Sequence, residues 1–422
     1  MTTNSTHHSV FYPQKRTMAM TSLDPKQLQQ ITNCPACDTW DTFRPQGVMG
    51  QYWMKRCARC GYSKDWPLPK IIKKIIYLDQ FVISNMVKCK QPFWTELRTR
   101  LASLASLQLI ACPYSEIHQD ESLLSHSLRE SLKGMYRSFG GNNQFRHTGR
   151  IEQTQLLRSI SSWLDVSHSD KARPLWRDAF DHDPHSWTGD FQVFADFPVH
   201  EPWVTDLRNR KQELHADLKS VCEYWKNHPA TFDEDVAEEV RGYARPSIEL
   251  YRSLAPAKFN RKVPPSIQPG VMLIHCLADE IKNARPDEAD PVQIVEEFFN
   301  SQAARYTPFL AISASLWAKI AQAVRNPKCS RVPDDGDSFD IKAISTYAPY
   351  CDAMFVEKEF EELWRQLKLN ERFAVRLFSV QSTDEFQAYL DDLLKNISDA
   401  HRAGLALLYP HLAPALAALD GK

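Results

Sequence analysis

The sequence predicts an α/β fold with a parallel sheet, interrupted by a mainly helical insertion and preceded by a small cysteine-bearing unit. Three observations lead to this prediction. Two apolar runs, KIIKKIIYLDQF and LQLIACPYS, flank an amphipathic stretch, and a similar alternation of helical and strand patterns returns after Tyr306. Two CxxC motifs precede the first run. A strand, a helix and a second strand in this order form a βαβ unit, whose strands are parallel.

The composition and charge are those of an ordinary globular protein. The chain has 422 residues, of which 43% are hydrophobic and 24% charged, and its formal net charge is −1. This length exceeds what one hydrophobic core usually fills, so two or three structural units are expected. A net charge near zero gives no long-range attraction to nucleic acid or to an anionic membrane, so any polyanion site must be local.

The cellular compartment is predicted from what the sequence lacks. The first twenty residues have no apolar centre typical of a secretion signal, and no run of about 18 uninterrupted apolar residues follows. We therefore expect a cytoplasmic protein without a membrane anchor. In a reducing cytoplasm its ten cysteines are thiols or metal ligands rather than disulfides.

Changes in pattern divide the chain into five segments. The opening residues are polar and unpatterned, and the connector WPLP separates the cysteine-bearing unit from the first apolar run. Beyond residue 130, long charged helical stretches with few strand signals predict a mainly helical insertion. The predicted segments are a flexible N-terminal segment 1–27, the cysteine-bearing unit 28–66, a first core part 67–130, the insertion 131–305 and a second core part 306–422.

Each element of the two core parts has its own signal. Apolar residues three or four positions apart predict a helix over 91–109. In the second part, PFLAISASLWAKIAQAVR, IKAISTYA and EFEELWRQL are predicted helices, and DAMFV and FAVRLFS are predicted strands. The sheet that begins near Lys70 is therefore expected to be completed by strands from the far end of the chain.

The two CxxC motifs predict a metal site. CPAC contains Cys34 and Cys37, CARC contains Cys57 and Cys60, and 19 residues separate the pairs. Each motif forms a knuckle that directs two thiolates at one ion, and two knuckles complete a tetrahedral site suited to Zn²⁺. Four thiolates leave no position for a substrate, so this zinc is expected to be structural. It would stabilise a zinc ribbon too small to bury a large core.

A basic stretch overlaps the ribbon and the first apolar run. Its cations lie within twenty residues that contain a single acid, Asp65. A solvated face at a domain boundary and a nucleic-acid contact surface are equally compatible with it. Tyr52 and Trp53 add aromatic rings that are able to stack on bases or to pack on the next domain. The basic residues are Lys55, Arg56, Arg59, Lys64, Lys70, Lys73 and Lys74.

The first two candidate acids follow the two early apolar runs. Asp79 closes IIYLD, at the end of a strand where ligands bind in open parallel sheets. It is equally a candidate for the N-cap of the next helix. Glu116 follows the second run, and Asp120 shares its helix face at position i+4. Asp120 or Glu121 is an alternative to Glu116 as the second acid.

A third acidic group surrounds the late strand DAMFV. Asp340 opens a predicted helix, Asp352 opens the strand, and Glu357 closes it. Asp352 has apolar neighbours, and a carboxylate in such surroundings is costly unless a positive group pairs with it. If the sheet is parallel, we expect these acids to converge with Asp79 and Glu116. Crowded carboxylates stay ionised together only around a cation.

Oxygen ligands of this kind select Mg²⁺ or Mn²⁺. Such an ion keeps several waters, can activate one of them, and can stabilise charge on a phosphate. The expected chemistry is therefore hydrolysis of a phosphodiester bond. This expectation requires Asp79 and Asp352 to lie close enough to share one cation.

These residues resemble a known family. YLDQFVISNM is similar to the opening strand, turn and helix of PIN-like nucleases, and DIKAI followed by a strand ending in an acid is similar to their late motif. The resemblance covers about 65–130 and 306–385. It implies a three-layer α/β/α sandwich that cleaves RNA with Mg²⁺ or Mn²⁺. It implies as catalytic acids, in chain order, Asp79, Glu116, Asp340 and Glu357, with Asp352 as a further neighbour.

The chain departs from the family in two respects. Its helical insertion is longer than in compact members, and Glu357 stands where the family usually has Asp, which moves the carboxylate outward by about one methylene. Two hypotheses follow. One is an endoribonuclease, with toxin or defence activity implied by resemblance alone. The other is a catalytically silent module that binds RNA, or a protein partner through the insertion.

Overall fold

The computed structural model describes residues 31–124, 128–140, 143–165, 174–188, 201–254, 269–326, 328, 333–412, 414 and 417. The predicted flexible segment 1–27 lies outside these residues. Within them, no helix combines the length and the apolar character needed to cross a membrane.

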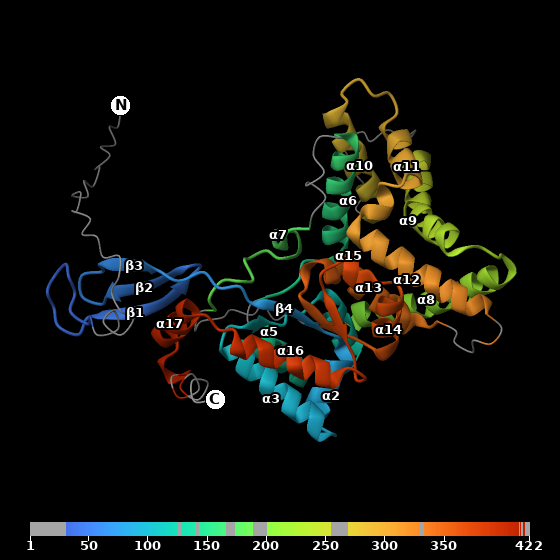
Figure 1. The fold of residues 1–422 in the computed structure, drawn as a ribbon. Coiled ribbons are helices and arrows are strands. Elements are labelled where there is room, and N and C mark those ends of the chain that lie inside the picture. The colour runs from blue at the N-terminus through green and yellow to red at the C-terminus, as the bar shows by residue number, and fades with distance from the viewer. Residues whose placement is uncertain are drawn as a thin grey trace, which may run out of the picture.

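The cysteine-bearing unit is a small antiparallel sheet near the cysteine cluster (Figure 1, left). Its strands are β1 (Phe43–Met49), β2 (Tyr52–Cys57) and β3 (Ser63–Pro67), in that spatial order. Their inner side is aromatic: the ring of Trp66 lies 6.0 Å from that of Phe43 and 5.5 Å from that of Trp53. All three rings are buried.

The central sheet is parallel throughout, as predicted. Its strands are β4 (Lys74–Leu78), β5 (Ile110–Ala111), β6 (Ala353–Phe355) and β7 (Arg376–Phe378), and their order is β5-β4-β6-β7. β4 therefore pairs on one side with the next strand of the chain and on the other with a strand from the far end. The prediction that late strands complete an early sheet is confirmed.

Helices cover both faces of this sheet because its buried strands carry apolar residues on both sides. Ile76 and Leu78 point to one face, and Ile75 and Tyr77 to the other. The first face packs on α2 (Gln80–Lys88), α3 (Pro92–Ser106), α5 (Arg129–Gly140), α16 (Thr383–Lys395) and α17 (Asp399–Leu408). The second packs on α8 (Glu201–Asn227), α12 (Pro308–Arg325), α13 (Asp335–Tyr347) and α14 (Lys358–Gln366).

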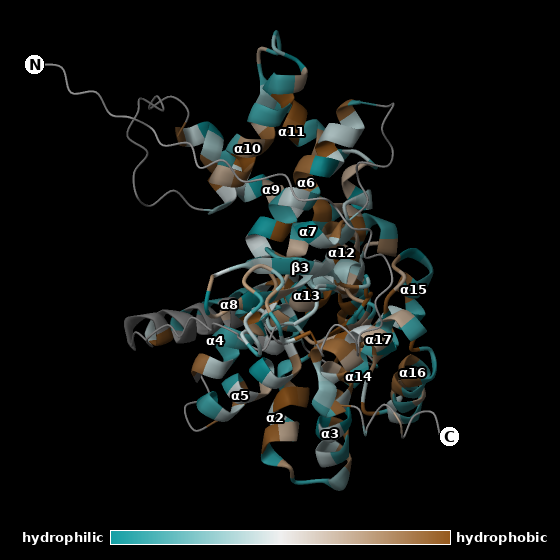
Figure 2. Cartoon of the chain, turned by 90° about the vertical axis from the view of Figure 1, so that its left-hand side faces the viewer, coloured by the Kyte–Doolittle hydropathy of each residue, from teal (hydrophilic) through white to brown (hydrophobic). Residues whose placement is uncertain are grey.

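The described part of the insertion is helical and has a core of its own (Figure 1, upper right). It is built from α6 (Thr148–Leu164), α9 (Phe232–Leu254), α10 (Pro269–Ala284) and α11 (Pro291–Asn300). Hydrophobic and hydrophilic residues both occur along these helices in Figure 2, as expected for amphipathic helices that share a core.

One helix crosses a predicted limit of the insertion, and another begins just beyond the other limit and packs in two cores. The limit at residue 131 falls inside α5, whose buried residues Leu132, Met135 and Phe139 belong to the core of the sheet. The limit at residue 305 is also not a clean boundary. Phe309, near the start of α12, packs in the helical core, and Ile320, near its end, packs on the sheet. α12 therefore joins the two cores.

Short elements complete the described chain. They are α4 (Glu116–Leu124), α7 (Trp176–Ala179), α15 (Leu369–Arg372) and the 3₁₀ turns η3 (Ala304–Tyr306), η4 (Ala348–Tyr350) and η5 (Pro410–Leu412). Of these, α4 matters most for function, because it follows β5 directly and begins beside the end of β4.

Candidate functional site

The four cysteines of the two CxxC motifs come together at the end of the small sheet. Their sulfur atoms all lie within 4.8 Å of one another. Two of the separations are 3.5 Å, between Cys34 and Cys60, and 3.8 Å, between Cys37 and Cys57. A tetrahedron with metal–sulfur bonds of about 2.3 Å has edges of about 3.8 Å, so the spacing suits a metal such as zinc. The cluster can hold such an ion.

Backbone amides near Cys57 favour its thiolate form. The amides of Arg59 and Cys60 donate to Sγ of Cys57 at 3.4 Å, and the amide of Ala36 donates to Sγ of Cys34 at 3.4 Å. Desolvation opposes ionisation of Cys57, but hydrogen bonds from Thr42 and from these amides outweigh it and bring its pKa to about 6. Metal binding therefore requires little additional work to deprotonate this thiol.

The basic stretch does not form one surface. Lys55 is buried: its Nζ donates to the carbonyl oxygen of Ile31 at 2.7 Å and lies 5.2 Å from the ring centroid of Trp53, which is buried as well. Lys73 is also buried, and Lys74 forms an ion pair with Asp352. The sequence could not show this, because a cation on a strand of alternating pattern looks the same whether its stem packs on aromatic rings or extends into water.

The carboxyl edge of the parallel sheet holds the second site. Asp79 directly follows β4, and its amide donates to the carbonyl oxygen of Phe355, the last residue of β6, at 3.0 Å. Glu357 stands two residues further along, so the ends of two neighbouring strands bring these acids to one place. Asp79 is also the N-cap of α2, with its Oδ1 accepting from the amide of Gln80 at 2.6 Å. Both interpretations of Asp79 from sequence therefore apply together.

Two carboxylates at this edge have pKa values that two further carboxylates raise, and we call the four the acidic cluster: Asp79, Asp340, Glu121 and Glu357. Burial, then Glu121 and Glu357, raise the pKa of Asp79 from the usual 3.8 to about 8. Burial, then Asp79, Glu357 and Glu121, raise the pKa of Asp340 to about 10. The groups that act most on both pKa values are carboxylates, and none is a cation. Negative charge concentrated in this way favours a cation or a proton.

The chain topology explains why residues so distant in sequence meet here. The chain leaves β4 through α2 and α3 on one face of the sheet to reach β5, and it returns to β6 through α13 on the other face. Ligand sites in open parallel sheets form where crossovers diverge in this way. α13 ends near the start of β6, at the amino edge of the sheet, so its first half lies at the opposite, carboxyl edge. This explains why Asp340, in that first half, lies near the other acids.

Glu116, the first choice for the second acid, does not belong to the acidic cluster. Its Oε2 lies 2.7 Å from Nε2 of His147, and its Oε1 accepts from the amide of Thr148 at 2.9 Å. Glu116 therefore secures the start of α6. Five helical positions separate it from Glu121, a rotation of about 140° around α4. Glu121, the alternative second acid, is the one that reaches the cluster. The rotation of α4 about its axis turns Glu121 toward the carboxyl edge and Glu116 toward the start of α6.

Asp352 was expected to share a cation with Asp79, and this expectation is wrong. Its carboxylate forms an ion pair with Nζ of Lys74 at 2.7 Å and accepts from the amide of Ile75 at 2.9 Å. Both partners lie at the amino end of β4, about 13 Å along the strand from Asp79. Asp352 opens β6 and Glu357 follows its end, so the two acids lie at opposite edges. The positive group that Asp352 requires is Lys74, not a metal ion.

The carboxylates are less compact than the cysteines. Among the described residues, the thiolates form the only group of three or more His, Cys, Asp or Glu side chains whose ligand atoms all lie within 4.8 Å of one another. Glu357 is exposed and Asp79 is buried, so the acidic cluster extends from the core to the surface.

Comparison with known proteins identifies no relative: no protein-family model, curated protein or solved structure matches the chain. No family match supports the resemblance to PIN-like nucleases. The functional argument therefore depends on the geometry of the two sites.

Proposed function

We propose that the chain is a metal-dependent endoribonuclease of the PIN-like kind, in which the acidic cluster binds Mg²⁺ or Mn²⁺. One observation carries the proposal: burial and the charges of Glu121 and Glu357 raise the pKa values of both Asp79 and Asp340 at the carboxyl edge, where the crossovers diverge. The ligand set differs from the expected one. Glu121 replaces Glu116, and Asp352 takes no part. The requirement that Asp79 and Asp352 share one cation is therefore not met, and the proposal depends on the acidic cluster alone.

A hydrated ion does not require the ligand atoms of all four carboxylates to lie within 4.8 Å of one another, as those of the cysteines do. Without a cation, ionised carboxylates repel one another and take up protons, as the raised pKa values of Asp79 and Asp340 indicate. Mg²⁺ and Mn²⁺ keep several waters and are often held by only one or two direct carboxylates. The remaining acids then orient those waters. When bound, the ion supplies an activated water and a positive charge for the phosphate of the RNA backbone.

The four cysteines would hold a structural Zn²⁺ in this protein, and the ribbon would contribute to RNA binding through its exposed residues. Those residues are Tyr52, Arg56 and Arg59, because Trp53, Lys55 and Lys73 are buried. Exposed aromatic and guanidinium groups stack on bases and pair with phosphates. We place the protein in the cytoplasm, in line with its free thiols.

A second candidate function is a catalytically silent module that binds RNA or protein. The observation that favours it is the looser geometry of the carboxylates compared with the cysteines. Under this alternative, the acidic cluster is a remnant of the fold without a bound ion, and RNA binding does not depend on a divalent metal.

Two acids of α4 provide a matched pair for the test. Purified wild-type protein, Glu121→Gln, Glu116→Gln and Asp79→Asn are incubated with end-labelled RNA and Mn²⁺. A bound metal contributes several kcal/mol to such a reaction. Glu121→Gln and Asp79→Asn should therefore lower the cleavage rate by roughly 100-fold or more, and Glu116→Gln should retain most of it.

Circular dichroism of each variant shows whether it is folded. Cleavage by Glu121→Gln at the wild-type rate would overturn the proposed ligand set. Metal-independent binding of RNA by the wild type, with no cleavage under Mg²⁺ or Mn²⁺, would support the silent module.

A further inference from the structure

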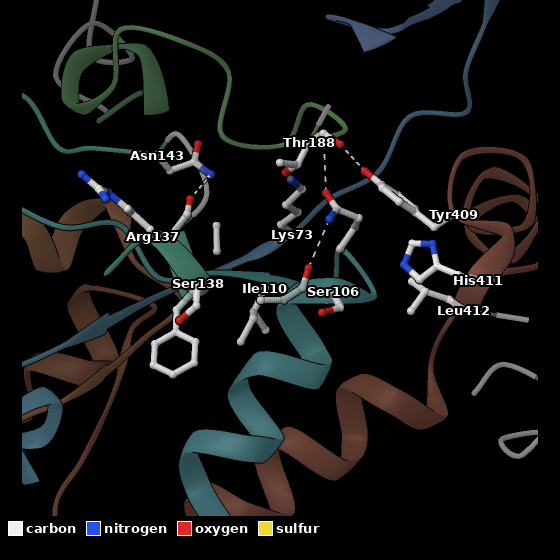
Figure 3. Close-up of a pocket in the computed structure, with 15 residues that line it drawn as sticks. Lys73, Ser106, Ile110, Arg137, Ser138, Asn143, Thr188, Tyr409, His411 and Leu412 are labelled. Atoms are coloured by element: carbon white, nitrogen blue, oxygen red, sulfur yellow. Dashed lines mark hydrogen bonds between the residues drawn. The ribbon is translucent and has the colours of Figure 1, made fainter. Parts of the chain in front are cut away.

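A second polar site lies at the other side of the sheet, away from the acidic cluster. A cavity of about 270 Å³ opens beside the edge strand β5. Residues from the ends of α3 and α5, from Thr188 and from η5 line it (Figure 3). Lys73, which immediately precedes β4, lies at its centre. Asp79 is six residues further along the chain, about 20 Å in an extended strand, so the two sites are separate.

Lys73 is the unusual residue of this cavity. Its side chain is only 2% exposed, and its Nζ donates to Oγ1 of Thr188 at 3.0 Å. Among the described residues, no carboxylate lies within ion-pair distance of that nitrogen. Burial lowers the pKa of Lys73 to about 7, and the more distant Asp183 only partly opposes this. A buried lysine without a close counter-ion tends to lose its charge, and an anion bound beside it would favour the ammonium form.

The other walls of the cavity carry the same sign of charge. Arg137 from α5 and His411 from η5 also line it, and none of the lining residues is acidic. Figure 3 shows Lys73 between Arg137 and Asn143 on one side and Tyr409 and His411 on the other. Lys73, Arg137 and His411, from three separate segments, therefore line one small cavity in a chain whose net charge is only −1.

Neutral groups complete the set of donors. The Nδ2 of Asn143 donates to the carbonyl oxygen of Gly140 at 2.9 Å, which holds the end of α5 in place. The close approach of Gly140 to Cys112, where a Cβ would lie 2.7 Å from the carbonyl oxygen, keeps that wall of the cavity tight. A phosphate group has several acceptor oxygens, and Arg and Lys together suit it better than they suit a neutral ligand.

We propose that this cavity binds the phosphate group of a small molecule, with Lys73 and Arg137 as its principal cationic ligands and His411 at the rim. The cavity lies just below the range of roughly 300–1,000 Å³ that is typical of ligand pockets. It therefore suits free phosphate or a mononucleotide better than a larger cofactor. This inference is independent of the proposed nuclease activity, because it uses neither the acidic cluster nor a divalent metal.

Isothermal titration calorimetry of the full chain, without added divalent metal, provides the test. The probes are inorganic phosphate, adenosine 5′-monophosphate and a short oligonucleotide with or without a 5′-phosphate. Arg137→Gln should weaken binding of the best probe about tenfold or more, because it removes a charge-assisted interaction. Lys133→Gln is the matched control: it removes the same charge one turn earlier on α5 and should change binding less than about twofold.

Lys73→Met should abolish binding of the phosphate probes. If this variant fails to fold, the result for Arg137→Gln alone tests the proposal. The probe that binds best identifies the source of the phosphate group. Absence of binding by every probe at millimolar concentration would overturn the proposal. Equal weakening by Arg137→Gln and Lys133→Gln would overturn it too, since that result indicates unspecific surface charge. A loss of binding in Asp79→Asn would assign the anion to the other edge of the sheet.

Discussion

The Nε2 atom of His118 lies 2.8 Å from the carbonyl oxygen of Leu78, the last residue of β4. The ring of His118 is fully buried and stacks on Tyr77, with 4.8 Å between ring centroids. Burial, which the hydrogen bond to Leu78 only partly opposes, lowers the pKa of His118 to about 4. The imidazole is therefore neutral at pH 7 and donates from Nε2. This bond fastens α4 to the strand end that precedes Asp79, one turn before Glu121.

We expect His118 to position the acidic cluster. His118→Ala removes a buried ring and leaves the carbonyl of Leu78 without its donor, so it should lower the free energy of unfolding by about 2–4 kcal/mol. It should also weaken Mn²⁺ binding, because α4 is no longer tied to β4. His118→Gln places an amide nitrogen near the position of Nε2 and should recover part of both losses. Urea unfolding and Mn²⁺ titration measure the two effects.

Recovery of stability by His118→Gln without any recovery of Mn²⁺ affinity would limit His118 to a packing role. Equal Mn²⁺ affinity in the wild type and in His118→Ala would show that α4 does not depend on this hydrogen bond for its position.

The acidic cluster should make the metal-free protein less stable as the pH rises. In the unfolded chain Asp79 loses its proton near pH 3.8, whereas in the folded chain its pKa is about 8. Between these values the unfolded state binds fewer protons, so the free energy of unfolding falls as the pH increases from about 4 to about 8. Asp79→Asn removes this contribution and should be more stable than the wild type at pH 8, by about 1 kcal/mol or more.

Mn²⁺ should reverse this order, because the ion takes the place of the protons. Added Mn²⁺ should raise the melting temperature of the wild type at pH 8 and leave that of Asp79→Asn nearly unchanged. Below about pH 6.5, His118 lowers the free energy of unfolding as the pH falls, which is the opposite trend to that of Asp79. Wild type and Asp79→Asn both contain His118, so its effect cancels in the difference between them. A wild type that is more stable than Asp79→Asn at pH 8 without metal would contradict the raised pKa of Asp79.

The cysteine cluster should carry a single zinc ion that holds the small sheet together. Elemental analysis should find about one zinc per chain, and Cys57→Ser should lose most of it. Cys89→Ser is the matched control, because Cys89 is an exposed thiol outside the cluster, whose Sγ donates to the carbonyl oxygen of Met86. Removal of the ion should expose Trp53 and Trp66 and shift tryptophan fluorescence to longer wavelength.

The larger part of the chain should keep its helical signal in circular dichroism, because the core on the second face of the sheet and the core of the insertion contain no residue of the cysteine-bearing unit. Full zinc content in Cys57→Ser, or unfolding of the whole chain when zinc is removed, would contradict the role assigned to the cluster.

Local patterns were sufficient to predict several features of this protein. The spacing of the CxxC motifs predicted that four sulfur atoms share one site, since each motif brings two thiolates together through local backbone geometry. The alternation of strand and helix predicted the parallel sheet, and the position of Asp79 after its strand predicted its place at the carboxyl edge. Glu357 follows the end of β6, as its pattern predicted, whereas Asp340 was expected to open a helix and lies inside α13.

Other features depend on contacts that no local pattern encodes. The choice between Glu116 and Glu121 depends on the rotation of α4, which His118 sets by bonding to Leu78. The burial of Lys55 and Lys73 depends on which surfaces cover them. The pairing of Asp352 with Lys74 depends on the register between β4 and β6, strands from opposite ends of the sequence.

By itself, then, the sequence determined the parallel sheet, the helical character of the insertion, the thiolate cluster and the acids that follow strand ends, because these depend on residues close together along the chain. Only the tertiary structure decided which carboxylates meet, which acid is neutralised by a lysine, and that a basic cavity lies behind the sheet. The physical reason is that charge acts through space: the pKa and the partner of a side chain depend on its neighbours and its burial, and both are decided by how distant segments pack.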